Sequence, residues 1–456
     1  MRILLWHGYL LTGSGSNIYT SNIAKLWRQS GHDVLLMCQE HRVHELPYVD
    51  EFGQFASDNR NFEVQATGAP RAPGRVRLVR PDIGQVLPVY VYDRYEGFTA
   101  KRFVDLDDDE LDFYTSSNIE AMITAIEDHN PDAIITGHEV MGPLVALKAC
   151  EAAGGSYLTK LHGSALEYAV KLQDRYKHYA RLGLCGAKVI TGGSEYMLKE
   201  ASSVIPGWLD KAVVVNPGCD IELFQPVANR NDNELVVGYV GKFLAQKGVH
   251  NLLAALGLTQ HESLRAVIVG YGDLDEALRA IWGAIQTGDI DELAAIAAGN
   301  EHEKLVDLGD LVDTGSVDDR YLRRARSIPL EFTGRLDHGS LSTILPTFDM
   351  LVVPSILAEA FGMVAAEAAA CGVLPIVPRH SGIGEAGAAV EEAVGEPGFL
   401  SYDPADPVRG IADRIDAVAA LPPARRAEMA TAAIELAHER WSWAHVAETL
   451  LGHAMS

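Results

Sequence analysis

The sequence has few positive charges for its length. Its 456 residues include 38 Lys and Arg against 62 Asp and Glu, so the formal net charge is -24. General affinity for nucleic acid requires a dense field of Lys and Arg over the phosphates. The deficit of cations therefore argues against nucleic acid as a partner, although a phosphate can still bind at one local site.

Cysteines and long apolar runs are scarce as well. The five cysteines are odd in number and far apart, with neither the spacing of a metal site nor that of a disulfide framework. No segment approaches the roughly 18 uninterrupted apolar residues of a membrane-spanning helix. The apolar start is interrupted by His7 and lacks a small-residue cleavage site, so it predicts a buried strand rather than a signal peptide. We therefore expect a protein of the reducing cytoplasm.

Apolar segments of strand length alternate with helical patterns along the chain. This alternation is typical of parallel sheets covered by helices on both faces. After Asn216 the apolar periodicity lapses, and Pro, Asn and Asp accumulate as in linkers. These features predict an α/β protein with two Rossmann-like, doubly wound domains, residues 1–220 and 221–439, that face each other across a cleft. Residues 40–115 would elaborate the first domain beside the cleft, and 273–330 would form a largely helical insertion.

The most informative segment is MLVVPSILAEAFGMVAAEAAACGVLPIVP, residues 350–378. It predicts a strand, a loop with Glu359, a helix of small residues that carries Glu367, and a second strand. The backbone amides of residues 361–363 would start the helix, where the positive end of its dipole can hold a sugar hydroxyl or a diphosphate oxygen. The two carboxylates could accept hydrogen bonds from different hydroxyls of one elongated ligand.

A second segment, VGYVGKFLAQKG at 237–248, leads from a strand into a loop with Lys242 and Lys247. Two cations at the carboxyl end of a strand can stabilise a diphosphate that leaves with extra negative charge. Two solvated loop lysines are the alternative interpretation of the same pattern.

The first loop, GYLLTGSGSN at 8–17, also contains glycines that allow the backbone to approach a phosphate or a sugar. It is a poor dinucleotide-binding fingerprint, because the third Gly of the G-x-G-x-x-G pattern is replaced by Ile18. The segment VGYGDLD at 269–275 fails in the same way at Asp275. A nicotinamide-dependent dehydrogenase is therefore disfavoured.

Polar residues follow two predicted strands of the first domain. His162 comes directly after one strand, and His138 and Glu139 follow the preceding one. A lone histidine is more often structural than functional. The carboxyl end of a parallel strand nevertheless favours a place at the edge where such sheets bind ligands.

Two charged stretches allow more than one interpretation. A helix predicted at 168–184 carries Lys171 and Arg175 along one face, which could be solvated or could dock an anionic acceptor or a lipid headgroup. The acidic run DLDDDELD at 105–112 could suggest a cation site. Because no strand flanks this run, we expect a solvated loop and no metal.

Together these segments resemble the retaining glycosyltransferases of family 4, which have the GT-B fold. The EAFGMVAAE block is the most specific of them, because its two glutamates have the spacing of the family pattern. The resemblance implies a C-terminal helix, about residues 440–456, that returns to the first domain. The matching segments are the glycine loop at 8–17, LHG at 161–163, NPGCDIELFQP at 216–226, GKF and QKG between 241 and 248, VGYGD at 269–273, FTGRL at 332–336, EAFGMVAAE at 359–367 and RWSWAHVAETL at 440–450.

The resemblance implies a donor site centred on the second domain. Glu367 would hold the ribose hydroxyls, Glu359 would hold the donor sugar, and Lys242 and Lys247 would hold the diphosphate. Lys242 stands where the family usually has Arg, so the charge is kept and the bidentate fork is lost. The full predicted donor site is Gly15, Ser16, Gly241, Lys242, Lys247, Gly270, Glu359, Phe361, Gly362, Met363 and Glu367, with the loop SGIGE at 381–385 nearby.

The resemblance also implies transfer of a sugar from a nucleoside-diphosphate sugar to an acceptor hydroxyl, with retention and without a metal or other cofactor. The expected catalytic residues are His162, which would contact the sugar near its C6 hydroxyl, with Lys242, Lys247 and Glu359. Asn17, Glu139, Lys171 and Arg175 are candidates for the acceptor site.

The acceptor and the reaction are not settled by these residues. The acceptor could be a small molecule, a sugar phosphate or a lipid headgroup, the last with weak peripheral membrane contact. A sugar-nucleotide epimerase and a non-catalytic nucleotide-sugar-binding protein are the alternatives. A phosphorylase or a disaccharide synthase of the same fold is a further alternative, more similar to a glycosyltransferase than these two.

Overall fold

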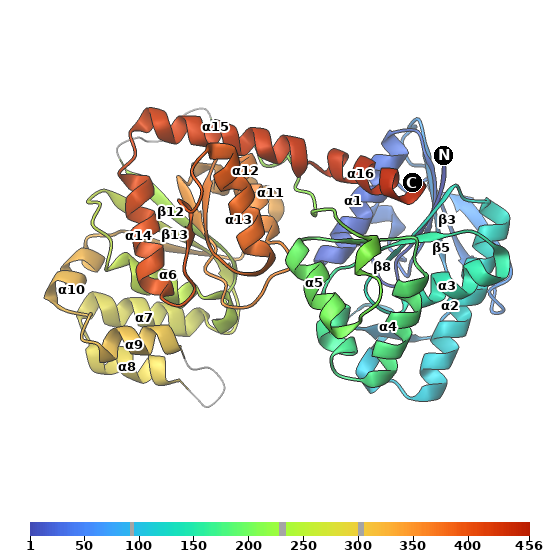
Figure 1. The fold of residues 1–456 in the computed structure, drawn as a ribbon, viewed down its shortest axis with the longest axis horizontal. Coiled ribbons are helices and arrows are strands. Elements are labelled where there is room, and N and C mark those ends of the chain that lie inside the picture. Colours follow the sequence, from blue (N-terminus) through green and yellow to red (C-terminus); the bar gives the residue numbers. More distant parts are fainter. Residues whose placement is uncertain (92–94, 228–233, 300–304) are drawn as a thin grey trace. The chain divides into compact units, whose positions relative to one another are not determined.

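The computed structural model describes residues 1–91, 95–227, 234–299 and 305–456. The chain forms two compact units, one of Met1–Gly218 with Trp443–Ser456 and the other of Cys219–Ser442 (Figure 1). The chain thus leaves the first unit at Gly218, two residues before the boundary predicted at 220. The return lies at Trp443, a few residues after the predicted one.

The first unit is built on a nine-stranded sheet in which β4 alone is antiparallel to its neighbour. A separate parallel pair, β6 (Val86–Val89) and β7 (Thr99–Arg102), belongs to the region predicted as an elaboration. In order across the large sheet, the strands are β11 (Ala212–Val214), β10 (Val189–Gly192), β9 (Tyr157–Lys160), β8 (Ala133–Gly137), β1 (Arg2–Trp6), β2 (Asp33–Met37), β5 (Arg75–Arg80), β3 (Glu51–Phe55) and β4 (Phe62–Ala66).

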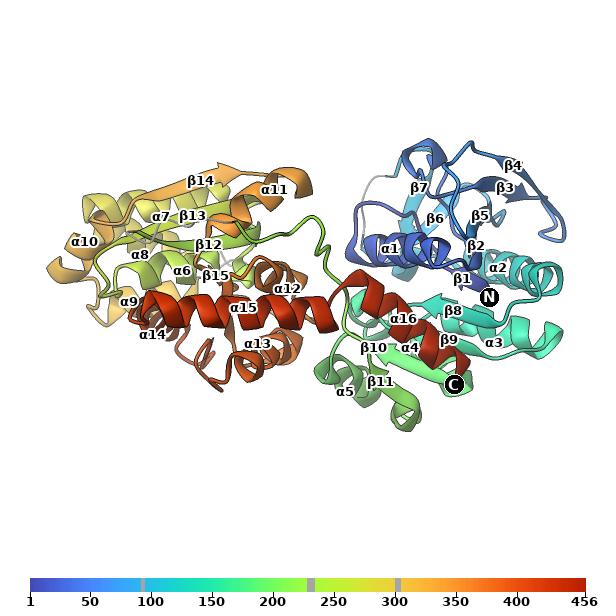
Figure 2. The same cartoon turned by 90° about the horizontal axis from the view of Figure 1, so that it is seen from above.

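Helices cover both faces of this sheet, as the alternation of strand residues requires. On β1, Ile3 and Leu5 belong to one core with residues of α1 and α16, whereas the Trp6 indole donates to Asn118 of α2 on the other face. Figure 2 shows α1 and α16 close to each other over the strands. The helices are α1 (Gly15–Gln29), α2 (Asp108–His129), α3 (Gly142–Ala153), α4 (Asp174–Gly186), α5 (Glu195–Val204) and α16 (Trp443–Met455), with single helical turns at Val43–Glu45, Phe103–Asp105, Leu166–Val170 and Leu209–Lys211.

The prediction of a helix at 168–184 is wrong about where the helix begins. A π-helical turn ends at Val170, and α4 begins only at Asp174. Between them Gln173 has an extended backbone, and its side-chain amide donates to the carbonyl of Val104 at 2.8 Å. This tertiary bond interrupts the helix that the local pattern predicts.

The second unit has a six-stranded sheet in which all paired strands are parallel. Its strands in order are β14 (Leu330–Gly334), β13 (Leu264–Tyr271), β12 (Leu235–Lys242), β15 (Met350–Val352), β16 (Leu374–Pro378) and β17 (Ser401–Tyr402). Its helices are α6 (Val249–Leu256), α7 (Asp275–Thr287), α8 (Ile290–Ala298), α9 (Val306–Asp313), α10 (Asp319–Arg326), α11 (His338–Ile344), α12 (Met363–Ala370), α13 (Ser381–Val394), α14 (Pro407–Ala419) and α15 (Pro423–Arg440), with single turns at Ala245–Lys247 and Leu345–Thr347.

The region 273–330 is helical as expected, with α7 to α10 in its described part. The acidic run at 105–112 is explained by the start of α2, because the Asp107 carboxylate accepts from the Glu110 amide and Glu110 reaches back to the Asp107 amide. Within the described residues, no helix is both long enough and apolar enough to cross a membrane.

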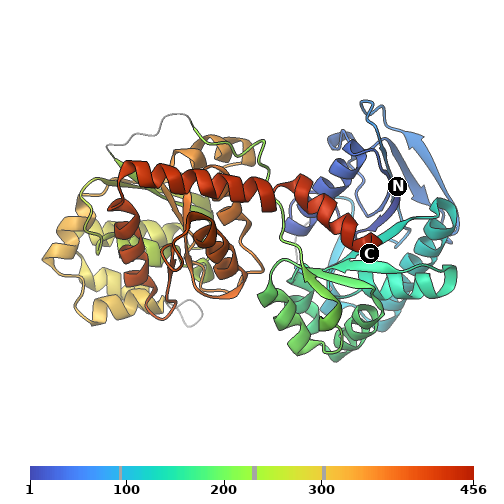
Figure 3. The same cartoon turned by 45° about the horizontal axis from the view of Figure 1, so that its top comes forward.

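The last helix, α16, completes the core of the first unit (Figure 3). The Trp27 indole of α1 donates to the carbonyl of Ala447 at 3.0 Å, and the ring of Trp443 lies 5.5 Å from that of Tyr19. A Cβ atom on Gly218 would lie 2.4 Å from the Trp443 ring, so only glycine allows this approach. The return of the chain is therefore held by aromatic packing as well as by connectivity.

We predict that Gly218→Ala lowers the free energy of unfolding by about 1–3 kcal/mol, since the added methyl group must displace the Trp443 ring. Denaturant unfolding measures the change. Gly452→Ala is the matched control, because a Cβ atom there meets nothing within 4 Å and α16 should gain about 0.5–1 kcal/mol from the better helix former. Equal stability of Gly218→Ala and the wild type would contradict the packing described here.

Candidate functional site

The candidate donor residues gather at the carboxyl edge of the second sheet. Central strand β12 is hydrogen-bonded to β13 on one side and β15 on the other. Gly241 is paired with Gly270, and Lys242 with Tyr271, at the last positions of β12 and β13. A Cβ atom on Gly270 would lie 2.0 Å from the Gly241 carbonyl, so the two strand ends depend on a glycine here.

Lys247 and Glu359 form an ion pair, with Lys247 Nζ 2.8 Å from Glu359 Oε1. Both side chains keep access to solvent, with 31% and 18% of their surfaces exposed. The carbonyl of Gln246 also accepts from the amides of Ile356 and Leu357 at 2.9 and 3.1 Å. The loops after β12 and β15 are thus joined, and the cation and the carboxylate singled out in the sequence lie side by side.

The loop that carries Glu359 is held from behind by the start of α13. Ser381 has a left-handed backbone, with φ 53°, and its hydroxyl accepts from the Glu359 amide at 3.0 Å. The Gly382 amide donates to the Glu359 carbonyl at 2.8 Å, and His380 Nε2 lies 3.0 Å from the carbonyl of Ser355. The sequence placed SGIGE near the donor but gave no role to His380, since a side chain that binds a distant carbonyl has no local signal.

Gly362 sets the start of α12. Its φ is +91°, and a Cβ atom there would lie 2.2 Å from the Ile383 side chain, so the position requires glycine. The Phe361 ring is buried 5.6 Å from the ring of Trp441, which anchors the chain just before the helix. Met363 is the first helical residue. Because the first amides of a helix have no intrahelical acceptor, this terminus can bind an oxygen of a ligand.

Glu367 lies about one turn into α12, with 13% of its side chain exposed. Burial, reinforced by the nearby Asp220 carboxylate, raises the pKa of Glu367 to about 8. The largely exposed His338 side chain lies nearby, with its Nε2 3.9 Å from Glu367 Oε1. A carboxyl group that holds its proton near neutral pH can both donate to and accept from the hydroxyls of a ribose.

In the first unit, the loops after β1, β8 and β9 bring three histidines together. The His138 ring lies 4.8 Å from that of His162 and 5.9 Å from that of His7. Among the described residues, neither ring nitrogen of buried His138 has a hydrogen-bond partner. Burial, with His138 and Lys160 nearby, holds the pKa of His162 well below its usual range, so the ring is neutral at pH 7.

Glu139 positions the strand end that bears His162. Its Oε1 accepts from the Gly163 amide at 2.7 Å, and burial raises the pKa of this carboxyl to about 7. Its other oxygen has no partner among the residues that the structure describes. Glu139 therefore lies where it can act on the LHG segment and on a ligand beside it.

The structure places the other candidates of the first unit differently. Gly15 and Ser16 form the exposed first turn of α1, capped by Ser14. Asn17 is buried, and its side chain bonds to His7 Nε2 at 2.9 Å and donates to the Thr12 carbonyl at 2.6 Å. It holds the first loop in place and presents no side-chain surface to an acceptor.

Lys171 and Arg175 make their contacts outside the histidine cluster. The Lys171 ammonium forms ion pairs with Glu167 and Glu200. The Arg175 guanidinium contacts Asp108 at 3.1 Å and donates to the Leu106 carbonyl at 2.7 Å. Both cations thus serve the packing of α4 and its neighbours.

A buried lysine was missed by the sequence analysis. Lys160 in β9 donates to the carbonyl of Val215, and its ammonium lies 5.4 Å over the ring of Tyr19. Burial lowers the pKa of Lys160 to about 7. The available signal was a lysine inside the apolar strand YLTKL, next to the LHG segment.

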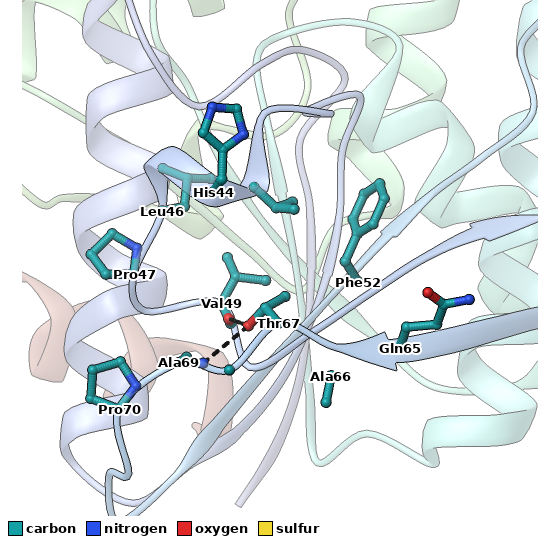
Figure 4. A pocket seen from close by; sticks show the side chains of 12 residues that line it. His44, Leu46, Pro47, Val49, Phe52, Gln65, Ala66, Thr67, Ala69 and Pro70 are labelled. Atoms are coloured by element: carbon teal, nitrogen blue, oxygen red, sulfur yellow. Dashed lines mark hydrogen bonds between the residues drawn. The ribbon is translucent and has the colours of Figure 1, made fainter.

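A pocket of about 380 Å³ in the first unit contains none of the predicted residues (Figure 4). It lies beside Ala66, which pairs with Glu51 at the start of β3, and therefore near the amino ends of the parallel strands. Its lining is largely apolar and includes Leu46, Val49 and Phe52. Within the described ranges, no three His, Cys, Asp or Glu side chains are arranged to hold a metal ion.

Comparison with known proteins now identifies the architecture. Sucrose-phosphate synthase from Thermosynechococcus elongatus has a TM-score of 0.61 and 20% identity, over 99% of this chain and 97% of that one. A glycosyltransferase from Rickettsia africae has a TM-score of 0.62 and 15% identity, over 99% and 97%. HepE from Anabaena, solved with UDP and glucose, has a TM-score of 0.58 and 16% identity, over 99% and 98%. This chain has the GT-B fold.

The sequence resemblance is confirmed over the C-terminal part of this GT-B protein. Residues 329–450 match the family described as Family 4 Glycosyltransferase in conflict systems. The match includes Glu359 and the helix α12, which carries Glu367. A search of curated proteins found no significant match.

We predict that Glu367→Gln changes the pH dependence of stability. The folded state keeps a proton on Glu367 between the ordinary carboxyl pKa of about 4.5 and the raised value of about 8, so wild-type stability falls as the pH rises through this window. The neutral amide abolishes that fall. Relative to wild type, the variant should therefore gain about 3 kcal/mol between pH 5 and pH 8.

Thermal unfolding at the two pH values measures this difference. Glu392→Gln, on the exposed surface of α13, is the control for loss of a carboxylate from the same unit. If Glu367→Gln keeps a constant offset from wild type at all pH values, the carboxyl does not hold a proton in the folded protein.

Proposed function

We propose that the protein is a retaining glycosyltransferase of the cytoplasm that moves a sugar from a nucleoside-diphosphate sugar to an acceptor hydroxyl, without a catalytic metal. The observation that carries this proposal is the Lys247–Glu359 ion pair beside the start of α12, with Glu367 in the same helix. It lies largely within the region that matches family 4. The similar HepE has been solved with UDP-glucose, and an E. coli protein of similar fold has been solved with UDP-2-fluoro glucose.

The charge distribution of the second unit favours a diphosphate at this edge. Two cations lie at the carboxyl end of β12, with Lys242 as its last residue and Lys247 in the loop that follows. Fixed cations stabilise the negative charge that develops on a leaving group, and they need no reorganisation at the moment of reaction. The amino end of α12 adds partial positive charge from the backbone.

The reaction that fits these groups breaks the bond between the anomeric carbon and the β-phosphate oxygen. The acceptor hydroxyl attacks from the face that the phosphate leaves and gives its proton to the departing phosphate oxygen. A new glycosidic bond and a nucleoside diphosphate result. Lys242 and Lys247 stabilise the phosphate, Glu359 and the amides at 361–363 hold the sugar, and Glu367 holds the ribose.

His162 of the first unit fits a hydrogen bond to a sugar hydroxyl rather than a charge contact, because its ring is neutral. Glu139 orients the backbone next to it through the Gly163 amide. We therefore treat His162 as a catalytic residue and Glu139 as a positioning residue.

The proposal predicts that one of UDP, GDP, ADP or dTDP raises the melting temperature of the purified protein in the presence of EDTA. A ligand at about 100 times its dissociation constant stabilises a protein by roughly 2.7 kcal/mol. Product formation from the matching sugar nucleotide then separates a transferase from a binding protein, and interconversion of donors would instead reveal an epimerase. Strict dependence on a divalent cation would overturn the metal-independent mechanism.

We predict that Lys247→Ala weakens binding of that nucleotide about tenfold or more, because a charge-assisted contact is lost. Arg265→Gln is the matched control, since it removes one positive charge at the amino end of the neighbouring strand β13. Calorimetric titration of both variants measures the effect. Equal losses in the two variants would mean that overall charge, rather than the loop after β12, determines the affinity.

A further inference from the structure

A second cationic edge lies in the first unit, and none of its basic residues is assigned above. Strands β2 and β5 are parallel neighbours, with Met37 paired to Val79, so their carboxyl ends adjoin. Arg80 is the last residue of β5, and His41 and Arg42 follow β2. In a protein with a formal net charge of -24, three basic side chains at one sheet edge require an explanation.

Arg80 is the centre of this group. Its side chain is half-buried, and burial lowers the pKa of its guanidinium. Among the residues that the structure describes, the Arg80 side chain forms no hydrogen bond or ion pair, and its Nε is buried without a partner. Leaving a charge partly desolvated and unpaired costs free energy. A ligand that carries the opposite charge would offset that free-energy cost.

Phe98 links Arg80 to His41. The Arg80 guanidinium carbon lies 5.5 Å from the centre of the Phe98 ring, and the His41 ring lies 5.7 Å from it in an edge-to-face arrangement. His41 Nδ1 is also buried without a partner in the described part of the chain. The ring thus contacts two side chains whose buried nitrogens, Arg80 Nε and His41 Nδ1, have no partner among the described residues.

The nearby carboxylates are already occupied by the backbone. Glu40 is buried, and its oxygens accept from the amides of Leu11, His41 and Arg42 at 3.1, 3.0 and 2.9 Å. An Asp82 oxygen accepts from the Gly84 amide at 3.0 Å. These bonds shape the edge and leave the Arg80 fork without a bidentate partner.

Arg42 borders the group toward the first glycine loop. Its Nη2 donates to the Thr12 hydroxyl at 3.3 Å, and its carboxylate neighbours Glu40 and Glu45 lie at 3.9 and 3.6 Å, too far for direct hydrogen bonds. Its Nε is buried without a partner among the described residues. The edge therefore offers two guanidinium groups and an imidazole beside the loop at 8–17.

We propose that Arg80, His41 and Arg42 bind the phosphate of a phosphomonoester-bearing acceptor. Calling this ligand the acceptor rests on the proposed glycosyltransferase function; the anion site itself rests on the contacts above. The planar arginine fork matches the oxygens of a phosphate, and a monoester offers three of them to several donors at once. The phosphate could belong to a free sugar phosphate or to a lipid headgroup.

The test is calorimetric titration of the full-length protein with inorganic phosphate and with glucose 6-phosphate. We expect both to bind, Arg80→Gln to weaken binding about tenfold or more, and Arg80→Lys to restore part of it. Arg71→Gln, at an exposed arginine of the same unit, should bind as wild type does. Lys247→Ala should also retain phosphate binding, because its loop belongs to the other unit.

The source of the phosphate is tested with vesicles of phosphatidylcholine, with and without phosphatidic acid. Arg80-dependent binding to the phosphatidic acid vesicles supports a lipid acceptor, and Arg80-dependent binding of glucose 6-phosphate alone supports a free sugar phosphate. Thermal unfolding checks that each variant is folded. Should Arg80→Gln be unfolded, Arg42→Gln serves the same comparison.

Phosphate binding that is absent in wild type, or lost in Lys247→Ala and kept in Arg80→Gln, would overturn the proposal. Nucleotide binding without Arg80-dependent phosphate binding defeats this inference and leaves the proposed function intact. Arg80-dependent phosphate binding without any nucleotide response defeats the proposed function and leaves the anion site standing.

Discussion

The ion pair between Lys247 and Glu359 is the interaction on which the second unit's candidate site depends. It joins the loops after two neighbouring strands, and the Gln246 carbonyl reinforces the junction through two backbone amides. Ser381 and Gly382 hold the same loop from the other side. In the proposed reaction, Lys247 would leave Glu359 to contact a phosphate, and the freed carboxylate would bind sugar hydroxyls, so the two halves of one ligand would be coupled.

The candidate sites of the two units differ in the charge of their side chains. In the second unit, the site presents solvent-accessible cations and a helix terminus to a ligand. In the first unit, His162, His138 and Glu139 are enclosed, and burial favours the neutral form of each by lowering the pKa of the two histidines and raising that of Glu139. Hydrogen bonding to hydroxyl groups suits such neutral groups, whereas phosphate binding suits the unpaired Arg80. The structure thus places the neutral groups and Arg80 at the ends of different strands.

The sequence alone predicts the α/β class, the two units and the place of the donor candidates, because these depend on local periodicity and on motif spacing. EAFGMVAAE contains its own strand end, glycine and helix, so its local structure could be inferred from adjacent residues. The supporting contacts of His380 and Ser381 could not, since a left-handed serine and a bond to a distant carbonyl leave no pattern. For the same reason Lys160 and Arg80 were missed, and Asn17, Lys171 and Arg175 were assigned to an acceptor although tertiary contacts engage them.

The position of α16 has a consequence for how the protein is made. Trp443, Val446 and Leu450 are buried in the core of the first unit together with Ile3, Ile23 and Val34, although some 400 residues separate them in the chain. During synthesis, the strands of the first unit are made long before α16, so the face of the sheet that α16 covers is exposed in the meantime. The second unit, Cys219–Ser442, is complete before those residues leave the ribosome. The first unit therefore completes its core only after the second unit has been synthesised, and it exposes apolar surface until α16 is made.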